Sequence, residues 1–278
     1  MRGIWRLRKL TCLGKHLWEI SKRKVWTIFL LKNWRQLNQE VNREQSGDLI
    51  MSTVPLRFRN GLELAMVSGG YAGYRLLFPE IYLEKCYQPN PDFVPRKDWT
   101  VVDLGANMGF YTLQAAYADN SARVIAVEPI PAYVCILKEN ISRNSMNHRV
   151  QVIEAAVTSR GQSQVPMTIW FSASGEPMVW TVVPQDAKRV QTIHVPGITL
   201  AEVFERGRID RCDLLKVDIE GAEYDIFEAV SERLWKRIHR IVMETHQTKN
   251  RNKNELVKLL GNAGFQVRTN ENMLWAWK

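Results

Sequence analysis

The sequence predicts an α/β protein of 278 residues, built on a doubly wound and mostly parallel sheet. Three observations lead to this fold class. From Thr100 onward, short apolar strands alternate with segments of helical spacing, which is typical of a parallel sheet with helices on both faces. Gly105 and Gly109 follow the first strand, where a strand turns into a helix. The last two strands are too close in the sequence for a crossover, so they are expected to form an antiparallel hairpin.

The period of the apolar residues places the elements along the chain. The predicted strands are 100–104, 123–128, 150–157, 213–219, 240–245, 265–269 and 273–277. The predicted helices are 108–118, 132–143, 223–230 and 252–263. Residues 158–199 show no helical period. We therefore expect them to form an inserted β-rich segment over one face, as an acceptor-binding wall or a lid.

Two regions precede the main domain, to which we assign residues 99–278. In residues 48–98, apolar side chains alternate around Asn60-Gly61. Both residues of such a pair tolerate a positive φ, so the pattern predicts a β-hairpin. A segment of helical spacing and a proline-rich connector follow, and together they form a helical lead-in. Residues 1–47 differ from both regions in composition and form a basic, amphipathic N-terminal arm.

The positive charge of the protein belongs to this arm. Residues 1–35 contain ten Lys or Arg and one acidic residue, which accounts for the whole formal net charge of +9. The remaining residues carry equal numbers of acidic and basic side chains. A neutral body lacks the basic surface that phosphates require, so we expect no nucleic-acid partner.

Residues 15–41 contain neither Pro nor Gly, and apolar residues recur there at helical spacing between Lys and Arg. The pattern predicts one long basic helix. Its apolar side could pack on the body or on a second copy in a homodimer, it could lie on an anionic membrane surface, or the arm could be a frayed tail. The longest apolar run, residues 25–31, is far shorter than the roughly 20 residues that span a bilayer.

The cysteines indicate a cytoplasmic protein, with peripheral membrane contact through residues 1–47 as an alternative. Cys12, Cys86, Cys135 and Cys212 are far apart and form no metal-binding pattern, so we expect reduced thiols without disulfides or structural zinc. No small-residue cleavage pattern follows the apolar run, which argues against a secretory signal.

The glycine-rich turn TVVDLGANMGFYT predicts a cofactor site at the carboxyl end of the sheet, where open α/β folds bind ligands. Its glycines are spaced as G-x-x-x-G, unlike the G-x-G-x-x-G of a pyrophosphate-binding loop. The second strand ends in Glu128, about 20 residues later, and a carboxylate there can accept both hydroxyls of a ribose. S-adenosyl-L-methionine fits both ends, because it has a ribose, an ammonium group and no phosphate. The alternative is an ordinary strand-to-helix turn.

Four segments carry a resemblance to a known family. They are VVDLGANMGFYT, VIAVEP, LLKVDIEGAEYDIF and IVMETH, and they resemble the ordered motifs of the FkbM-type S-adenosylmethionine-dependent methyltransferases. The resemblance covers about residues 55–245 and implies a class I methyltransferase (Rossmann-like) sheet. It also implies that the methionine part of the cofactor lies against Asp103, Gly105, Asn107 and Gly109, with Glu128 on the ribose. Members of this family usually methylate hydroxyl groups on sugars or on secondary-metabolite and lipid scaffolds.

Candidate catalytic residues follow the fourth and fifth strands. Methyl transfer to an alcohol requires an aligned nucleophile and a group that accepts its proton. Lys216, Asp218 and Glu220 share one side of an extended chain, and charges in a central strand are costly unless they are used or paired. We assign Asp218 and Glu220 to contacts with cofactor and acceptor, with a buried pair to Lys216 as the structural alternative. His246 is a third candidate, as proton acceptor, or else an exposed histidine at a strand end.

Carboxylates near Asp218 could also bind Mg²⁺, but the pattern does not fix a metal and we assign none. The sequence therefore predicts an S-adenosylmethionine-dependent methyltransferase that O-methylates a hydroxyl on a sugar, glycolipid or secondary-metabolite scaffold. Two alternatives remain open. One is N-methylation of a small molecule, and the other is a membrane- or polyanion-binding protein that acts through its basic arm.

Overall fold

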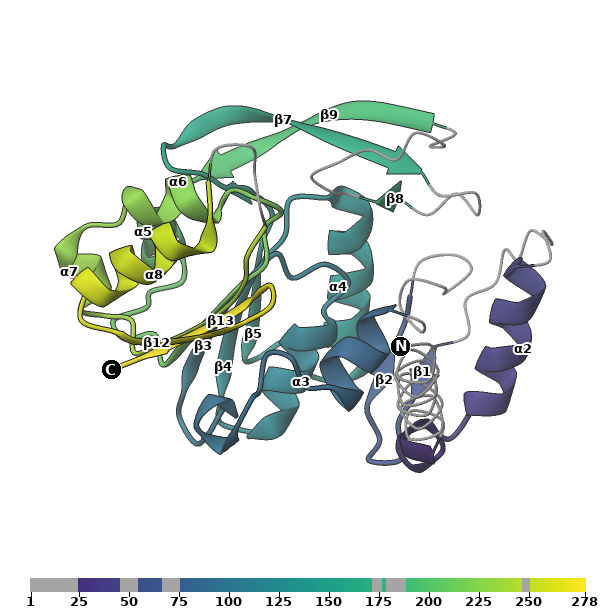
Figure 1. Cartoon of the computed structure of the whole chain (residues 1–278). Coiled ribbons are helices and arrows are strands. Elements are labelled where there is room, and N and C mark those ends of the chain that lie inside the picture. Colours follow the sequence, from purple (N-terminus) through teal and green to yellow (C-terminus); the bar gives the residue numbers. More distant parts are fainter. Residues whose placement is uncertain (1–24, 46–54, 67–75, 172–176, 179–188, 247–250) are drawn as a thin grey trace, which may run out of the picture.

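The computed structural model describes residues 25–45, 55–66, 76–171, 177–178, 189–246 and 251–278. In this part of the chain a seven-stranded sheet forms the centre of the molecule, with the strand order β12-β13-β11-β10-β3-β4-β5 (Figure 1). The strands are β3 (Thr100–Leu104), β4 (Arg123–Val127), β5 (Val150–Ile153), β10 (Leu214–Val217), β11 (Arg240–Glu244), β12 (Gln266–Asn270) and β13 (Met273–Trp277). All are parallel except β13, which pairs antiparallel with both β11 and β12.

This strand order confirms the predicted class I methyltransferase sheet. The chain begins the sheet at its centre with β3, adds β4 and β5 on one side, and then crosses back to add β10 and β11 on the other. The crossing creates a topological switch point between β3 and β10, and open α/β sheets bind ligands at such a point, outside the carboxyl ends of the strands. The predicted antiparallel hairpin at the end of the chain is also confirmed.

Helices cover both faces of the sheet because its central strands are apolar on both sides. Within β3, Val101 belongs to one core, whereas Val102 and Leu104 belong to the other. The helices of the first core are α3 (Phe110–Ala118) and α4 (Pro131–Arg143), and those of the second are α5 (Leu200–Arg206), α6 (Glu223–Glu228), α7 (Glu232–Trp235) and α8 (Lys253–Asn262).

Two of these helices, α5 and α7, were not predicted. α5 nevertheless begins with a capping box, in which Thr199 and Glu202 each accept the backbone N–H of the other. This Thr-x-x-Glu pattern is visible in the sequence, directly after the inserted segment.

The inserted segment forms most of a second sheet, with the order β6-β9-β7-β8. Its strands are β6 (Ala156–Val157), β7 (Gln162–Phe171), β8 (Pro177–Met178) and β9 (Arg189–Ile198). The single predicted strand over residues 150–157 is therefore wrong in its extent. Its last two residues leave the central sheet because they pair with the end of β9. β7 and β9 form a long antiparallel hairpin that lies across the top of the molecule in Figure 1.

The described part of the N-terminal arm packs on the body. Residues 25–30 are helical, the helix stops at Leu31, and α2 (Trp34–Gln45) follows. The predicted uninterrupted helix over residues 15–41 is therefore wrong at Leu31, and its part before residue 25 lies outside the described residues. Leu31 stops the helix because it forms an antiparallel bridge with Phe58, beside the predicted hairpin of β1 (Leu56–Arg57) and β2 (Glu63–Leu64). Both Leu31 and Leu37 are buried in the first core.

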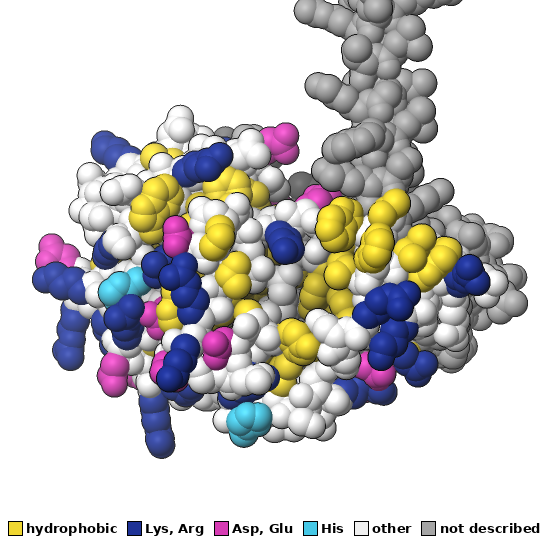
Figure 2. Space-filling view, turned by 90° about the horizontal axis from the view of Figure 1, so that it is seen from below, with side chains coloured by type: hydrophobic (Ala, Val, Ile, Leu, Met, Phe, Trp, Pro, Cys, Tyr) yellow, Lys and Arg dark blue, Asp and Glu magenta, His cyan; other side chains and the backbone are white. Residues whose placement is uncertain are grey.

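The arm also exposes apolar side chains. Trp26 and Phe29 are 53% and 66% exposed, and their ring centroids lie 6.3 Å apart. Figure 2 shows hydrophobic side chains beside Lys and Arg side chains on the side of the molecule where the arm lies. None of the helices in the described ranges is long and apolar enough to cross a membrane.

Candidate active site

A cavity of about 350 Å³ lies at the carboxyl ends of β3, β4 and β10. This volume falls within the range of about 300–1,000 Å³ that is usual for small-molecule sites. The turn after β3, the end of β4 and the residues after β10 line its base, and Ile81 of the short π-helical segment η2 (Pro79–Leu83) contributes from the lead-in region. Val165 and Met167 of β7 line it as well, so the inserted hairpin forms part of the wall.

The turn after β3 is shaped by residues with positive φ. Gly105 has φ +74°, and a Cβ there would lie 1.8 Å from the carbonyl oxygen of Asp218, so only glycine fits. Asn107, with φ 51°, lines the cavity together with Gly105. Gly109 begins α3 with φ +90° and packs toward Leu137, and it is not one of the lining residues. The turn therefore brings Gly105 and Asn107 to the cavity and uses Gly109 to start the helix.

Glu128 lies at the end of β4 and lines the cavity, as expected for a ribose ligand. The side chain is only 4% exposed. Its two oxygens accept the backbone N–H groups of Asn107, at 2.7 Å, and Ile130, at 2.9 Å. Burial raises the pKa of Glu128 to about 7, against these two hydrogen bonds, which lower it. These hydrogen bonds thus hold the carboxylate in a fixed orientation next to the turn after β3.

Asp103 is fully buried and does not line the cavity. It lies 3.1 Å from Nζ of Lys216, its register partner on β10, and accepts a hydrogen bond of 2.6 Å from Thr112. Lys216 in turn donates to the carbonyl oxygen of Gly105 at 2.7 Å. Burial alone would lower the pKa of Lys216, but the charges of Asp103 and Asp218 outweigh burial and raise it. The structure therefore brings Asp103 to the turn through Lys216, and not directly to the cavity.

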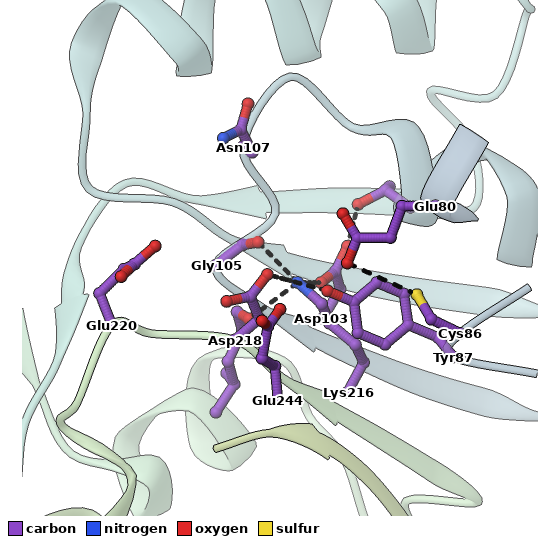
Figure 3. A network of polar contacts seen from close by, with 12 residues as sticks. Glu80, Cys86, Tyr87, Asp103, Gly105, Asn107, Lys216, Asp218, Glu220 and Glu244 are labelled. Atoms are coloured by element: carbon purple, nitrogen blue, oxygen red, sulfur yellow. Dashed lines mark hydrogen bonds and ion pairs between the residues drawn. The ribbon is translucent and has the colours of Figure 1, made fainter. Parts of the chain in front are cut away.

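Asp218 lies at the cavity and at the centre of a polar network (Figure 3). One of its oxygens accepts a hydrogen bond of 2.9 Å from the Tyr87 hydroxyl and lies 3.7 Å from Nζ of Lys216. Its other oxygen lies 4.0 Å from Nε2 of His246. Glu220 also lines the cavity and lies 3.6 Å from the same nitrogen. The three predicted catalytic residues are therefore neighbours in space.

His246 is held between carboxylates. Its Nδ1 lies 2.7 Å from the buried carboxylate of Glu223, on the side opposite to Asp218 and Glu220. Burial by itself would lower the pKa of His246, but the hydrogen bond and charge of Glu223, with the charges of Glu220 and Asp218, raise it to about 9. The structure places His246 beside the two other predicted catalytic residues, and its role as proton acceptor stays a prediction.

Two further carboxylates complete the network. Burial and then the charge of Asp218 raise the pKa of Glu244, at the end of β11, to about 7, and the same two causes raise the pKa of Glu80 on η2. Glu244 ends β11 and stands two positions before His246, which is a usable sequence signal. Glu80 and Tyr87 were missed because they come from the lead-in region and no local pattern links them to Asp218.

The fold and this site together define a class I methyltransferase. A family model described as the methyltransferase FkbM domain matches residues 103–267, more than half of the chain, and the chain belongs to this family. The protein is therefore an S-adenosylmethionine-dependent methyltransferase. The site fits that group, because the buried, oriented Glu128 is suited to a ribose and the carboxylates of Asp218 and Glu220 line the cavity to which a cationic ligand would bind.

Individual relatives agree with the family. Methyltransferase sdnD of Sordaria araneosa is 24% identical over 73% of this chain and 85% of its own length. The 31-O-demethyl-FK506 methyltransferase FkbM of Streptomyces tacrolimicus is 26% identical over 80% of this chain and 92% of its own. Among solved structures, the precorrin-6y C5,15-methyltransferase of Geobacter metallireducens matches 66% of this chain and 81% of that chain, with 15% identity and a TM-score of 0.41.

Proposed function

We propose that this methyltransferase transfers its methyl group to a hydroxyl oxygen on a secondary-metabolite, sugar or glycolipid scaffold. The observation that carries the proposal is the group of carboxylates beside the cavity, formed by Asp218, Glu220 and Glu244. An alcohol must lose its proton as its oxygen attacks, whereas a neutral amine attacks with its lone pair and needs less help. The relative from Streptomyces tacrolimicus is named as a methyltransferase of a 31-O-demethyl compound, and this name supports methyl transfer to oxygen.

Each residue of the cavity has a separate role in the proposed methyl transfer. S-adenosylmethionine, when bound, supplies a methyl group on a positively charged sulfur. Glu128 orients the ribose through its two fixed oxygens. Asp218 and Glu220 present negative charge to the cavity, and Glu220 accepts the proton of the acceptor hydroxyl. The side chains of β7 in the cavity wall contact the acceptor.

The test is a product analysis. The full-length protein is incubated with S-adenosylmethionine that carries a deuterated methyl group and with a panel of monosaccharides, glycolipids and polyhydroxylated macrolides. Mass spectrometry detects labelled product, and NMR assigns the labelled methyl to oxygen or nitrogen. We expect the label on oxygen. Glu220→Gln should lower kcat by roughly 10²–10⁴-fold, which is the usual range for a lost general base. A label found on nitrogen with amine-bearing acceptors would mean that this protein is an N-methyltransferase instead.

The arm supports a second candidate function, peripheral contact with an anionic membrane. Trp26 and Phe29 are exposed beside the exposed basic residues Lys32 and Arg35, an arrangement typical of helices that lie at a membrane interface. Co-sedimentation with phosphatidylserine vesicles should be lost in the double variant Trp26→Ala/Phe29→Ala and kept in Tyr117→Ala, which removes a different exposed aromatic side chain. Equal sedimentation of all three proteins would reject membrane contact through these residues.

A further inference from the structure

A group of ligand-type side chains lies beside the cavity. Asp218, Glu244 and His246 each offer an oxygen or nitrogen atom, and these atoms lie within 4.8 Å of one another. Asp218 follows β10, Glu244 ends β11 and His246 comes just after it, and β10 and β11 are adjacent parallel strands. Glu244 and His246 are not among the residues that line the cavity.

His246 is oriented by a residue outside this group. Its Nδ1 lies 2.7 Å from one oxygen of Glu223, whose side chain is 0% exposed and whose other oxygen has no hydrogen-bond partner among the described residues. A carboxylate in this position fixes the imidazole ring and its tautomer, and such pairs are usual behind histidines that bind metal ions. Nε2 is left facing Asp218 and Glu220.

The basic side chain next to this group is already engaged. Lys216 lies 3.7 Å from Asp218 but closer to the buried Asp103, at 3.1 Å, and it donates to the carbonyl oxygen of Gly105. Figure 3 shows Glu80 on the far side of the same network, so one more carboxylate faces this point. The arrangement gathers carboxylates from three parts of the chain beside Lys216, whose ammonium group is shared with Asp103 and the carbonyl oxygen of Gly105.

We propose that Asp218, Glu244 and His246 bind one divalent cation. Two carboxylates and one imidazole form a mixed set of ligands. The imidazole suits Zn²⁺ or Fe²⁺ and argues against Ca²⁺, and the carboxylates suit Mn²⁺, which serves as a spectroscopic probe of the site. On binding, the cation takes the place of a proton at Nε2. Three protein ligands leave further coordination positions open.

A second hollow lies near this group of side chains. It has a volume of about 540 Å³ and is lined by Glu80, Asn272 and Trp275, among others. Asn272 donates a hydrogen bond from its side chain to Glu244, so the hollow borders the proposed cation site. A cation there would bind the acceptor oxygen and lower the pKa of its hydroxyl, with Glu220 as proton acceptor. This consequence rests on the proposed function, but the cation site itself does not.

The test measures Mn²⁺ binding without any acceptor. The full-length protein, treated with EDTA and desalted, is titrated with Mn²⁺ and followed by electron paramagnetic resonance, in which the unbound ion gives the strong signal. We expect one bound Mn²⁺ per chain and nitrogen modulation of its spin echo from the imidazole of His246. Glu244→Gln should weaken the affinity at least tenfold, and His246→Gln should remove the nitrogen modulation. Glu205→Gln, which changes an exposed carboxylate on α5, should bind as the wild type does.

Three results would overturn the proposal. They are absence of binding up to millimolar Mn²⁺, binding without nitrogen modulation in the wild type, and displacement of Mn²⁺ by saturating S-adenosylhomocysteine. The last result would mean that the carboxylates serve the methyl donor. The wild-type spectra test the proposed cation site even if a variant fails to fold. Because no methyl transfer is measured, a negative result here leaves the proposed O-methylation standing, and a positive one does not prove it.

Discussion

At the scale of single residues, carboxylates near the carboxyl ends of three strands have different surroundings. Asp103 is buried beside Lys216, Glu128 is held by two backbone N–H groups, and Asp218 borders the cavity. Burial favours the neutral acid, whereas N–H donors and nearby cations favour the ionised form. For Glu128, burial outweighs the two N–H donors and raises the pKa of the carboxyl group to about 7.

The raised pKa of Glu128 predicts that cofactor affinity depends on pH. Ribose hydroxyls donate to the ionised carboxylate, and this form is lost as the pH falls through about 7. We expect the affinity for S-adenosylhomocysteine, measured by calorimetry, to fall about tenfold between pH 8 and pH 6, because a carboxyl group with a pKa of about 7 is roughly 90% ionised at pH 8 and roughly 10% ionised at pH 6. Glu128→Ala should bind at least tenfold more weakly at pH 8 and show little change with pH. A wild-type affinity that is constant over this range would contradict the assignment.

The pair of Lys216 and Asp103 predicts a large loss of stability when one partner is removed. Lys216→Gln leaves a buried carboxylate without its cation, which costs about 3–5 kcal/mol of unfolding free energy in such pairs. The double variant Asp103→Asn/Lys216→Gln should recover part of the loss, as measured by urea denaturation. Lys138→Gln is the control, because its ion pair with Glu154 is half exposed and such pairs contribute about 0–1 kcal/mol. Equal effects of the two lysine changes would refute this role of Lys216.

At the scale of elements, the site depends on how closely the turn after β3 approaches the end of β10. The backbones of Gly105 and Asp218 are so close that no side chain fits between them. Lys216 joins the same two strands, because it is in register with Asp103 and donates to Gly105. The carboxyl ends of β3 and β10 are thus fixed to one another, and the residues that follow both strands face one cavity.

This contact predicts that Gly105→Ala is much more harmful than another glycine replacement. The added Cβ would clash with the backbone oxygen of Asp218, and the positive φ adds strain, so we expect a loss of at least about 2 kcal/mol of unfolding free energy. Gly261→Ala is the matched control within α8, where a Cβ meets no atom within 4 Å. That change should stabilise the protein by roughly 0.4–1 kcal/mol. Urea denaturation measures both changes in unfolding free energy. If Gly105→Ala leaves the unfolding free energy unchanged, the turn after β3 can move away from β10.

At the scale of the whole molecule, the N-terminal arm is part of the folded body. Leu31 is 0% exposed and bridges to Phe58, and Lys32 donates a backbone hydrogen bond to Arg57. The same first core contains Ile81 and Tyr87 of the lead-in region, and Tyr87 reaches Asp218. Packing of the arm therefore supports the region that supplies one side of the active site. Removal of residues 1–47 would take away core side chains, so it does not isolate the surface properties of the arm.

This packing predicts very different losses of stability for substitutions at two apolar residues that lie two positions apart in the sequence. Leu31→Ala should destabilise the protein by about 2–5 kcal/mol, the usual cost of removing a buried leucine side chain. Phe29→Ala, at a position that is 66% exposed, should change the unfolding free energy by less than about 0.5 kcal/mol. Chemical denaturation of the full-length variants measures both. Similar values for the two would mean that the arm does not pack on the body as described.

The sequence by itself determined the features that depend on short-range patterns. The alternation of strands and helices, the terminal hairpin and the hairpin around Asn60-Gly61 were predicted because period and turn chemistry act over a few residues. The positions of Glu128 and Asp218 at strand ends followed from the same patterns, since parallel strands of a sheet end at one edge. Even the capping box of α5 was readable, although it was missed.

Only the tertiary structure decided what depends on contacts between distant residues. Asp103 belongs to the cofactor motif, yet its pairing with Lys216 turns it into a buried support for the turn. The break at Leu31 results from its bridge to Phe58, which no helical period reveals. Tyr87 and Asp218 are 131 residues apart and share a hydrogen bond. The burial of Glu244 and His246 and the charges near them come from residues that are remote in sequence. The pKa of Glu244 and the surroundings of His246 therefore follow from the fold and not from a local pattern.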